Sequence, residues 1–217
     1  MMIPRLLKRI LCGLTFLFAQ AVFAADITVL ISDQHGQPLN NAVVEVKTER
    51  PQARSALPLA IMDQVAKQFK PLVLVVEQGQ QVNFPNSDNI RHHVYSFSET
   101  KPFQLKLYSG QPEAPITFDN NGVVVLGCNI HDSMVGYIYV AKGGMTIKTD
   151  ESGQAMLKEI TLPAEITVWQ PLQAAPLEQT QRISLAENSP SSLQVTINTT
   201  APTPRNTFGS KFKGGND

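Results

Sequence analysis

The sequence predicts an all-β protein, and three observations support this fold class. Short apolar runs rich in valine, isoleucine, threonine and aromatic residues recur along the chain, and several of them alternate with polar residues. Glycine, proline, asparagine and aspartate separate these runs. Helix-like spacing is limited to Ile61, Val65 and Phe69, which lack a clear capping residue and leave the structure of that segment open. Many short strands with regularly spaced turns are typical of β-sandwiches and Greek-key barrels.

Nine segments meet these criteria for strands. The run GVVVLGC has no alternation, so we expect a buried strand that delivers Cys128 to the end of a sheet. The nine predicted strands are residues 26–33, 42–48, 72–79, 81–84, 92–97, 122–128, 137–141, 164–170 and 192–198.

The chain begins with a segment typical of secretory signal peptides. Three basic residues, Arg5, Lys8 and Arg9, precede an apolar stretch at residues 10–23, and small residues follow it. We therefore expect residues 1–24 to be removed and the mature protein to be exported to the periplasm. No other run reaches the roughly 18 apolar residues that cross a bilayer, so we expect no membrane segment in the mature chain.

The mature chain that remains is of moderate length and weakly acidic. Removing the leader leaves 193 of the 217 residues and changes the net charge from 0 to −3, because the leader carries three basic and no acidic groups. This length suits one large or two small domains, and we prefer two. The weak charge gives no indication of nucleic-acid binding. The last residues, 201–217, are rich in proline, glycine and polar residues and are predicted to be disordered.

Cys128 is the only cysteine that follows the leader. Exported proteins normally use cysteines in pairs, as disulfides. A single cysteine therefore indicates an intermolecular disulfide, a reactive free thiol or a thiolate bound to a metal ion.

Two breaks divide the predicted strands. Residues 49–60 contain proline, alanine and arginine without periodicity, and residues 141–145 contain a glycine pair, so both are predicted to be connections. The outer pieces, 25–50 and 145–200, resemble the two halves of a carboxypeptidase-regulatory-like domain, an immunoglobulin-like or prealbumin-like β-sandwich. The resemblance rests on the turn DQHGQP, the following AVVEV strand and the segment TDESG. It implies that residues 60–142 are inserted into a loop of a host sandwich.

Sulfur and nitrogen donors gather in this predicted insert. His92 and His93 begin a strand, after a loop rich in asparagine, serine and aspartate. Cys128, His131 and Met134 lie in the motif CNIHDSM between two strands. Two imidazoles, one thiolate and one weak thioether form the ligand set of a type 1 copper site. Thiolate and thioether favour Cu(I) and imidazole tolerates Cu(II), so this set suits a copper ion that changes its charge.

Both segments resemble the cupredoxins, the small blue copper proteins. The spacing in CNIHDSM is similar to that of amicyanin, and VNFPNSDNIRHHV is similar to the first ligand segment of the family. The resemblance implies a Greek-key cupredoxin sandwich of the amicyanin or plastocyanin type, in which His92, Cys128, His131 and Met134 bind one type 1 copper ion. This chain has His93 where the family usually has asparagine, which leaves His93 open as a competing ligand. The whole arrangement is also similar to periplasmic proteins labelled methylamine utilization protein, a label that need not involve methylamine.

Strand geometry separates the two neighbouring histidines. Successive side chains of a strand point to opposite faces, so we favour His92 over His93 as the ligand. His35 lies in a polar turn and Asp132 beside a ligand, and we expect both to be solvated. The cupredoxin resemblance further implies that His131 lies at the surface, in an apolar patch near Ile130.

The predicted ligand set indicates an electron carrier. Catalytic metal sites keep one position open, whereas four protein ligands leave none, so we expect no enzymatic activity. We expect single-electron exchange with a redox partner such as a c-type cytochrome or a periplasmic dehydrogenase. A copper carrier or chaperone and a non-redox binding module of immunoglobulin-like type remain alternatives. A cysteine hydrolase built on Cys128 and His131 is disfavoured, because the sequence gives no sign of an orienting group or an oxyanion site.

Overall fold

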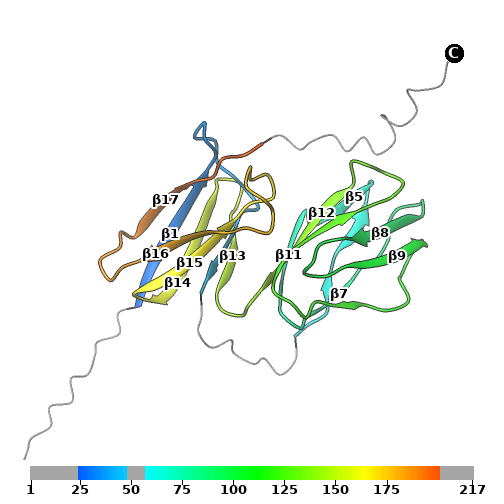
Figure 1. Ribbon diagram of the computed structural model, residues 1–217, viewed down its shortest axis with the longest axis horizontal. Helices are drawn as coiled ribbons and strands as arrows, with labels where there is room; N and C mark the ends of the chain where they lie inside the picture. The colour runs from blue at the N-terminus through cyan, green and yellow to red at the C-terminus, as the bar shows by residue number, and fades with distance from the viewer. Residues whose placement is uncertain (1–23, 48–56, 201–217) are drawn as a thin grey trace, which may run out of the picture.

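The computed structural model of the protein describes residues 24–47 and 57–200, where all regular structure is β-strand (Figure 1). The all-β prediction is therefore confirmed. The predicted signal peptide lies outside this part of the chain except for Ala24, with which the first strand begins, and the predicted disordered tail lies outside it altogether. No helix in the described part of the chain is long and apolar enough to cross a membrane.

Strands from the beginning and the end of the described chain pair with one another and form one sandwich, here called the frame lobe. One sheet has the order β14-β1-β17 and the other β13-β2-β15-β16. β1 pairs antiparallel with β14 and parallel with β17. The strands are β1 (Ala24–Ser32), β2 (Val43–Val46), β13 (Thr146–Lys148), β14 (Gln154–Thr161), β15 (Ala164–Trp169), β16 (Gln181–Leu185) and β17 (Ser192–Thr196).

The strands between them form a second sandwich, here called the central lobe. A five-stranded sheet has the order β6-β12-β11-β8-β9, and it is faced by the sheet β10-β7-β3 and the hairpin β4-β5. The strands are β3 (Ala60–Ile61), β4 (Asp63–Val65), β5 (Gln68–Lys70), β6 (Val73–Glu77), β7 (Gln81–Asn83), β8 (His92–Ser96), β9 (Phe103–Tyr108), β10 (Ile116–Thr117), β11 (Gly122–Gly127) and β12 (Val135–Ala141).

Each of the nine predicted strands has a counterpart, whereas the segment with helix-like spacing is not helical. Ile61 ends β3, Val65 ends β4 and Phe69 lies in β5. Phe69 is buried but the other two are exposed, so the three residues do not share one buried face. Between β4 and β5, Ala66 and Lys67 have positive φ angles of 52° and 58°. Two successive residues of this kind are typical of a tight hairpin turn.

In the sheet β13-β2-β15-β16, the central strand β2 and the end of its neighbour β15 carry buried side chains on both faces, which explains why each has two successive apolar residues there. On β2, Val44 packs into the frame core, whereas Val43 packs toward the central lobe. On β15, Val168 packs into the frame core and Trp169 packs toward the central lobe. Trp169 meets Tyr139 of β12, with ring centroids 5.9 Å apart. The two lobes seen side by side in Figure 1 therefore share a packed interface.

A buried hydrogen-bond pair lies in this interface between the lobes. Glu45 of β2 is 8% exposed, and its carboxylate accepts hydrogen bonds from the Tyr139 hydroxyl and from the Lys142 backbone N–H, both at 2.8 Å. Burial, assisted by the negative charge of Glu45, raises the pKa of Tyr139 above its usual value. Tyr139 therefore keeps its proton and remains a hydrogen-bond donor across the interface.

We expect Tyr139→Phe to lower the free energy of unfolding by about 1–3 kcal/mol, because it leaves a buried carboxylate oxygen without this donor. Chemical denaturation measures the loss, and a double-mutant cycle with Glu45→Gln isolates the part that belongs to the pair. An unchanged unfolding midpoint in Tyr139→Phe would show that the hydrogen bond contributes nothing to stability.

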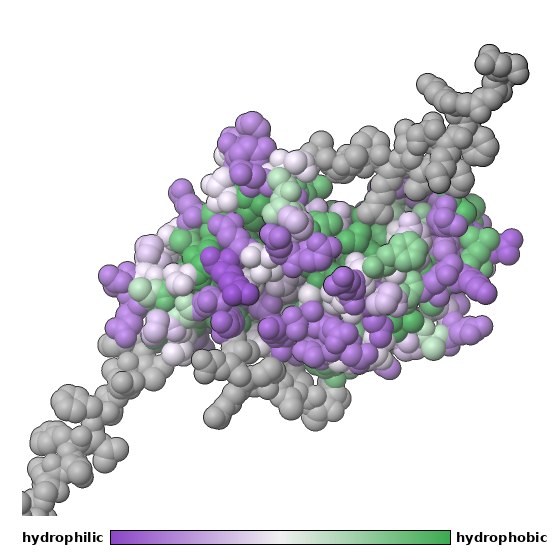
Figure 2. All heavy atoms as spheres, in the orientation of Figure 1, coloured by the Kyte–Doolittle hydropathy of each residue, from purple (hydrophilic) through white to green (hydrophobic). Residues whose placement is uncertain are grey.

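The surface is mixed in polarity. Figure 2 shows hydrophilic side chains spread over both lobes on the face in view, with smaller hydrophobic areas between them. Scattered apolar exposure of this kind is normal for folded proteins. This face therefore has no dominant apolar patch that would indicate a functional site (Figure 2), and the candidate site is identified from its side chains.

Candidate metal centre

The structure brings His92, Cys128 and His131 together. One ring nitrogen of each histidine and the cysteine sulfur all lie within 4.8 Å of one another. Cys128 Sγ is 3.7 Å from His92 Nδ1 and 3.9 Å from His131 Nδ1. The two imidazole rings are inclined at 59°, with centroids 5.0 Å apart. Three of the four side chains predicted to bind metal therefore converge, and both histidines present Nδ1 to the sulfur.

These separations fit a common metal ion. A metal bonded at about 2.3 Å to a thiolate sulfur and at about 2.0 Å to an imidazole nitrogen, with an angle of about 120° between the bonds, holds the two donor atoms about 3.7 Å apart. The two measured sulfur–nitrogen distances, 3.7 and 3.9 Å, agree with this value. A set of two imidazoles and one thiolate also has the donor chemistry that copper accepts in both oxidation states.

Three neighbouring strands position the donors. Cys128 directly follows β11, which pairs with β12 on one side and with β8 on the other. His92 begins β8, and the pairing of Gly127 with Tyr95 holds β8 beside the end of β11. Met134 ends the intervening loop, directly before β12 begins at Val135. The predicted strand 137–141 therefore begins earlier than expected, next to the motif itself.

The fourth predicted ligand, Met134, lies in the same buried cluster as Cys128 and is 1% exposed. Its backbone N–H donates to the carbonyl oxygen of His131 at 2.9 Å, which closes the loop into a tight turn. His92 and Cys128 are also buried, with exposures of 0% and 3%. His131 is partly exposed, so one ring of the group reaches the surface while the other donors are enclosed.

His93 is not a member of the donor group. Its ring lies 5.7 Å from that of Tyr95, the next residue on the same face of the strand, and its Nε2 accepts a hydrogen bond from the Gln104 side-chain amide at 2.8 Å. Burial lowers the pKa of His93. The register of β8 against β9 shifts between His92 and Val94, at the level of His93. Both histidines are buried, but they lie in different surroundings.

Sequence reasoning missed Asp88, which precedes His92 by four residues. Its Oδ2 is 2.7 Å from His92 Nε2, and its two oxygens accept the backbone N–H groups of Ala66 and Lys67 at 2.6 and 2.9 Å. Slight burial acts to raise the pKa of Asp88, but the N–H of Lys67, the ring of His92 and the N–H of Ala66 together lower it below its usual value. The sequence feature that could have identified Asp88 is an acidic residue in the loop directly before His92.

Asn86 holds the loop that leads to His92. It is 4% exposed, and its amide donates to the carbonyl oxygens of Ile90 and Tyr108, both at 2.9 Å. Its backbone N–H and C=O also bond to Gly110, and its Oδ1 accepts the N–H of Asp88 at 3.1 Å. Asparagine in this loop predicted a turn, whereas its actual contribution is to tie the loop to the chain that follows β9.

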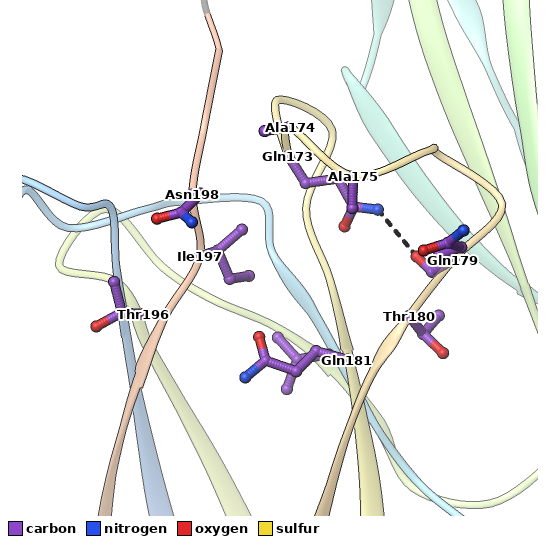
Figure 3. A pocket seen from close by; sticks show the side chains of 10 residues that line it. Gln173, Ala174, Ala175, Gln179, Thr180, Gln181, Thr196, Ile197 and Asn198 are labelled. Atoms are coloured by element: carbon purple, nitrogen blue, oxygen red, sulfur yellow. Dashed lines mark hydrogen bonds between the residues drawn. The ribbon is translucent and has the colours of Figure 1, made fainter.

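A separate pocket of about 450 Å³ lies in the frame lobe, whereas the donor group lies in the central lobe (Figure 3). It opens beside β16 and β17, and its side chains are amides, hydroxyls and short apolar groups. The Gln173 amide donates to the Gln179 carbonyl oxygen at 2.9 Å. The lining residues are Val168, Gln173, Ala174, Ala175, Gln179, Thr180, Gln181, Thr196, Ile197 and Asn198. None of them is a histidine, cysteine or acidic residue, so this pocket offers no comparable metal site.

No protein-family model and no curated protein matches the chain. Among solved structures, a copper-containing nitrite reductase from Thermus scotoductus SA-01 is 28% identical over 43% of this chain and 25% of its own, with a TM-score of 0.37. A reduced amicyanin variant is 19% identical over 45% of this chain and 97% of its own, with a TM-score of 0.36. A purple cupredoxin from Nitrosopumilus maritimus is 23% identical over 38% and 99%, with a TM-score of 0.32. The chain thus spans a quarter of the nitrite reductase, and its similarity to cupredoxins covers less than half of its own length.

Proposed function

We propose that this protein is a periplasmic type 1 copper protein that carries single electrons between redox partners. One observation carries the proposal: one ring nitrogen from each of two histidines and a cysteine sulfur converge within 4.8 Å, in a largely buried site from which one ring reaches the surface. Bound copper supplies a couple that exchanges one electron.

In this proposal, His92, Cys128 and His131 hold the three strong positions and Met134 supplies the weak axial sulfur. Near-complete burial of His92, Cys128 and Met134 keeps water from the donors. Four protein ligands leave no position for a substrate, which is the physical reason to assign no catalytic activity. The ligands are attached to paired strands, so a change of charge at the site requires little movement of the chain.

The lobes are proposed to be two domains. Residues 60–142 form the cupredoxin domain, and residues 25–50 and 145–200 form the immunoglobulin-like frame around it. Two observations support this division: strands pair only within each lobe among the described residues, and each lobe has a hydrophobic core of its own. The shared interface around Trp169 and Tyr139 supports a fixed attachment of one domain to the other.

Electrons are proposed to enter and leave through the ring of His131. This ring is partly exposed, and the adjacent Ile130 is 51% exposed, which gives the exchange point an apolar neighbour. The partner is a c-type cytochrome or a periplasmic dehydrogenase. A net charge of −3 for the mature chain provides only weak electrostatic steering, so contact at this surface selects the partner more than long-range attraction does.

A copper carrier is the second candidate, because the same ligands would bind copper for transport. A carrier must release its ion, whereas here the donors come from two separate segments around residues 92 and 128–134, and both are held by paired strands. A dedicated Cu(I) carrier is also expected to use more sulfur than this mixed set. Both features favour retention of the ion.

The test offers the Cu(II)-loaded protein an electron donor and, in a separate mixture, a copper acceptor. Copper-loaded protein is mixed with reduced cytochrome c and, separately, with a copper-free periplasmic acceptor. We expect the copper protein to take up electrons rapidly from the cytochrome, which is measured as a change in the absorbance of the cytochrome. Metal analysis of the same samples is expected to show that copper stays bound. Copper transfer without fast electron exchange would establish the carrier and reject the shuttle.

We expect Met134→Leu to keep the visible colour and to shift the reduction potential, because the axial bond is long and weak while the three strong donors remain. Leucine conserves the buried volume, so the loss of stability should stay below about 1.5 kcal/mol. Met156→Leu is the matched control, since Met156 is 50% exposed on β14 of the frame lobe. Equal potentials for the two variants would remove Met134 from the ligand set.

A further inference from the structure

We propose that Asp88 is a positioning residue, which fixes the proton of His92 on Nε2 and couples this ring to the tip of the β4-β5 hairpin. The role of this ring at copper rests on the proposed function, whereas the proton position and the coupling do not.

The two nitrogens of His92 face different partners. Nδ1 lies 3.7 Å from Cys128 Sγ, and Nε2 lies 2.7 Å from Asp88 Oδ2. An ionised carboxylate has no proton to donate, so the short contact requires the proton on Nε2. When the ring is neutral, its lone pair then lies on Nδ1, the nitrogen that faces the Cys128 sulfur. The exposed fraction of the His92 side chain is 0%, so no water competes for either nitrogen.

Asp88 is itself held by the hairpin turn. Its carboxylate accepts the N–H groups of Ala66 at 2.6 Å and Lys67 at 2.9 Å. Ala66 and Lys67 are the two turn residues beyond the last pair of the β4-β5 ladder, Val65 and Gln68, and both have left-handed backbone angles, with φ of 52° and 58°. The hairpin forms a separate two-stranded sheet, so its tip is not part of the large sheet that carries His92. Asp88 therefore bonds to the backbone of one element and to the ring of another.

This arrangement has an electronic consequence. A carboxylate that accepts the outer N–H of a metal-binding histidine orients the ring and raises its basicity. A more basic imidazole stabilises the more highly charged ion of a redox couple. Asp88 therefore favours Cu(II) over Cu(I), and removing its charge is expected to raise the reduction potential of the loaded protein.

The first test uses the metal-free protein. Nitrogen–proton NMR of the histidine rings is expected to show His92 protonated on Nε2, with a proton that exchanges slowly with water. In Asp88→Ala we expect a mixture of ring forms and fast exchange, because all three donors lose their acceptor. Lys67→Gln is the matched control: it changes a side chain at the same turn, keeps the backbone N–H and should leave the His92 signal unchanged.

The second test uses Asp88→Asn, which keeps the size of the side chain and one acceptor oxygen but removes the charge. We expect the variant to keep its colour and to favour Cu(I) about tenfold more than the parent, which for one electron is a rise of about 59 mV. Lys67→Gln removes a positive charge and is expected not to raise the potential. If Asp88→Ala does not fold, Asp88→Asn decides the question through both its potential and its ring signal.

The outcomes separate this inference from the proposed function. If the parent protein binds copper without a thiolate charge-transfer band, the proposed function is rejected. The NMR comparison of the metal-free proteins still tests the position of the His92 proton. The role of Asp88 is overturned by two results together in a protein whose parent form is coloured. The reduction potential is unchanged in Asp88→Asn, and the His92 ring signal is unchanged in Asp88→Ala.

Discussion

Replacing Cys128 by serine is expected to abolish the intense colour of the copper-loaded protein. Cys128 supplies the one sulfur of the group His92, Cys128 and His131. A short bond between copper and a thiolate gives a charge-transfer band that nitrogen and oxygen ligands do not produce. Loss of an outer-shell partner of a ligand already costs about 10–100-fold in metal affinity. Loss of the thiolate itself should therefore weaken copper binding by more than about 100-fold.

The measurement is a visible and paramagnetic-resonance spectrum after addition of Cu(II) to parent and variant. Serine is close to cysteine in size, and circular dichroism can verify that the variant remains folded. Ser96→Ala is a suitable control, because Ser96 is 1% exposed on the neighbouring strand but is not a member of the donor group. A variant that stays coloured, or a parent that binds copper without the band, would show that the type 1 assignment is wrong.

His92→Ala is expected to destroy the type 1 spectrum, whereas His93→Ala is expected to preserve it. The two residues are neighbours on β8 with exposures of 0% and 8%, so their removal opens similar buried spaces and each variant controls for the other. The difference lies in their partners. His92 Nδ1 lies near the Cys128 sulfur, while His93 bonds to Gln104.

Both variants are compared by their spectra after copper loading and by their unfolding midpoints. We expect both variants to lose a similar amount of stability, while only His92→Ala loses the type 1 spectrum. The reverse spectral result would mean that β8 is displaced by one residue, because a shift of one position moves every side chain of a strand to the other face.

Several strands were predictable from local pattern, and others were not. β14 was missed because alanine, methionine, leucine, lysine and glutamate are good helix formers. It is a strand because Ala155 and Leu157 alternate on the core side and pair with Val29 and Ile27 of β1. The short strands β3, β4, β5 and β10 contain two or three residues each, too few for any periodicity to be read. Their existence depends on pairing with distant partners.

The sequence by itself determined the chemistry of the candidate site. The identity of the donors and their order follow from His92 and the motif CNIHDSM, and the apolar run before Cys128 predicted a strand that ends there. These are local properties, because the donor types of the side chains set which metal ions they favour and the strand pattern is carried by adjacent residues.

Only the tertiary structure decided how these donors are held. The Nε2 atom of His92 contacts Asp88, and Asp88 is held in turn by Ala66 and Lys67, more than 20 residues earlier in the chain. Tyr139 donates a hydrogen bond to Glu45, which lies 94 residues earlier in the chain, and this bond joins the two lobes. Hydrogen bonds of this kind require distant segments to meet at a defined angle. The folded backbone sets that angle, and no local pattern of residues encodes it.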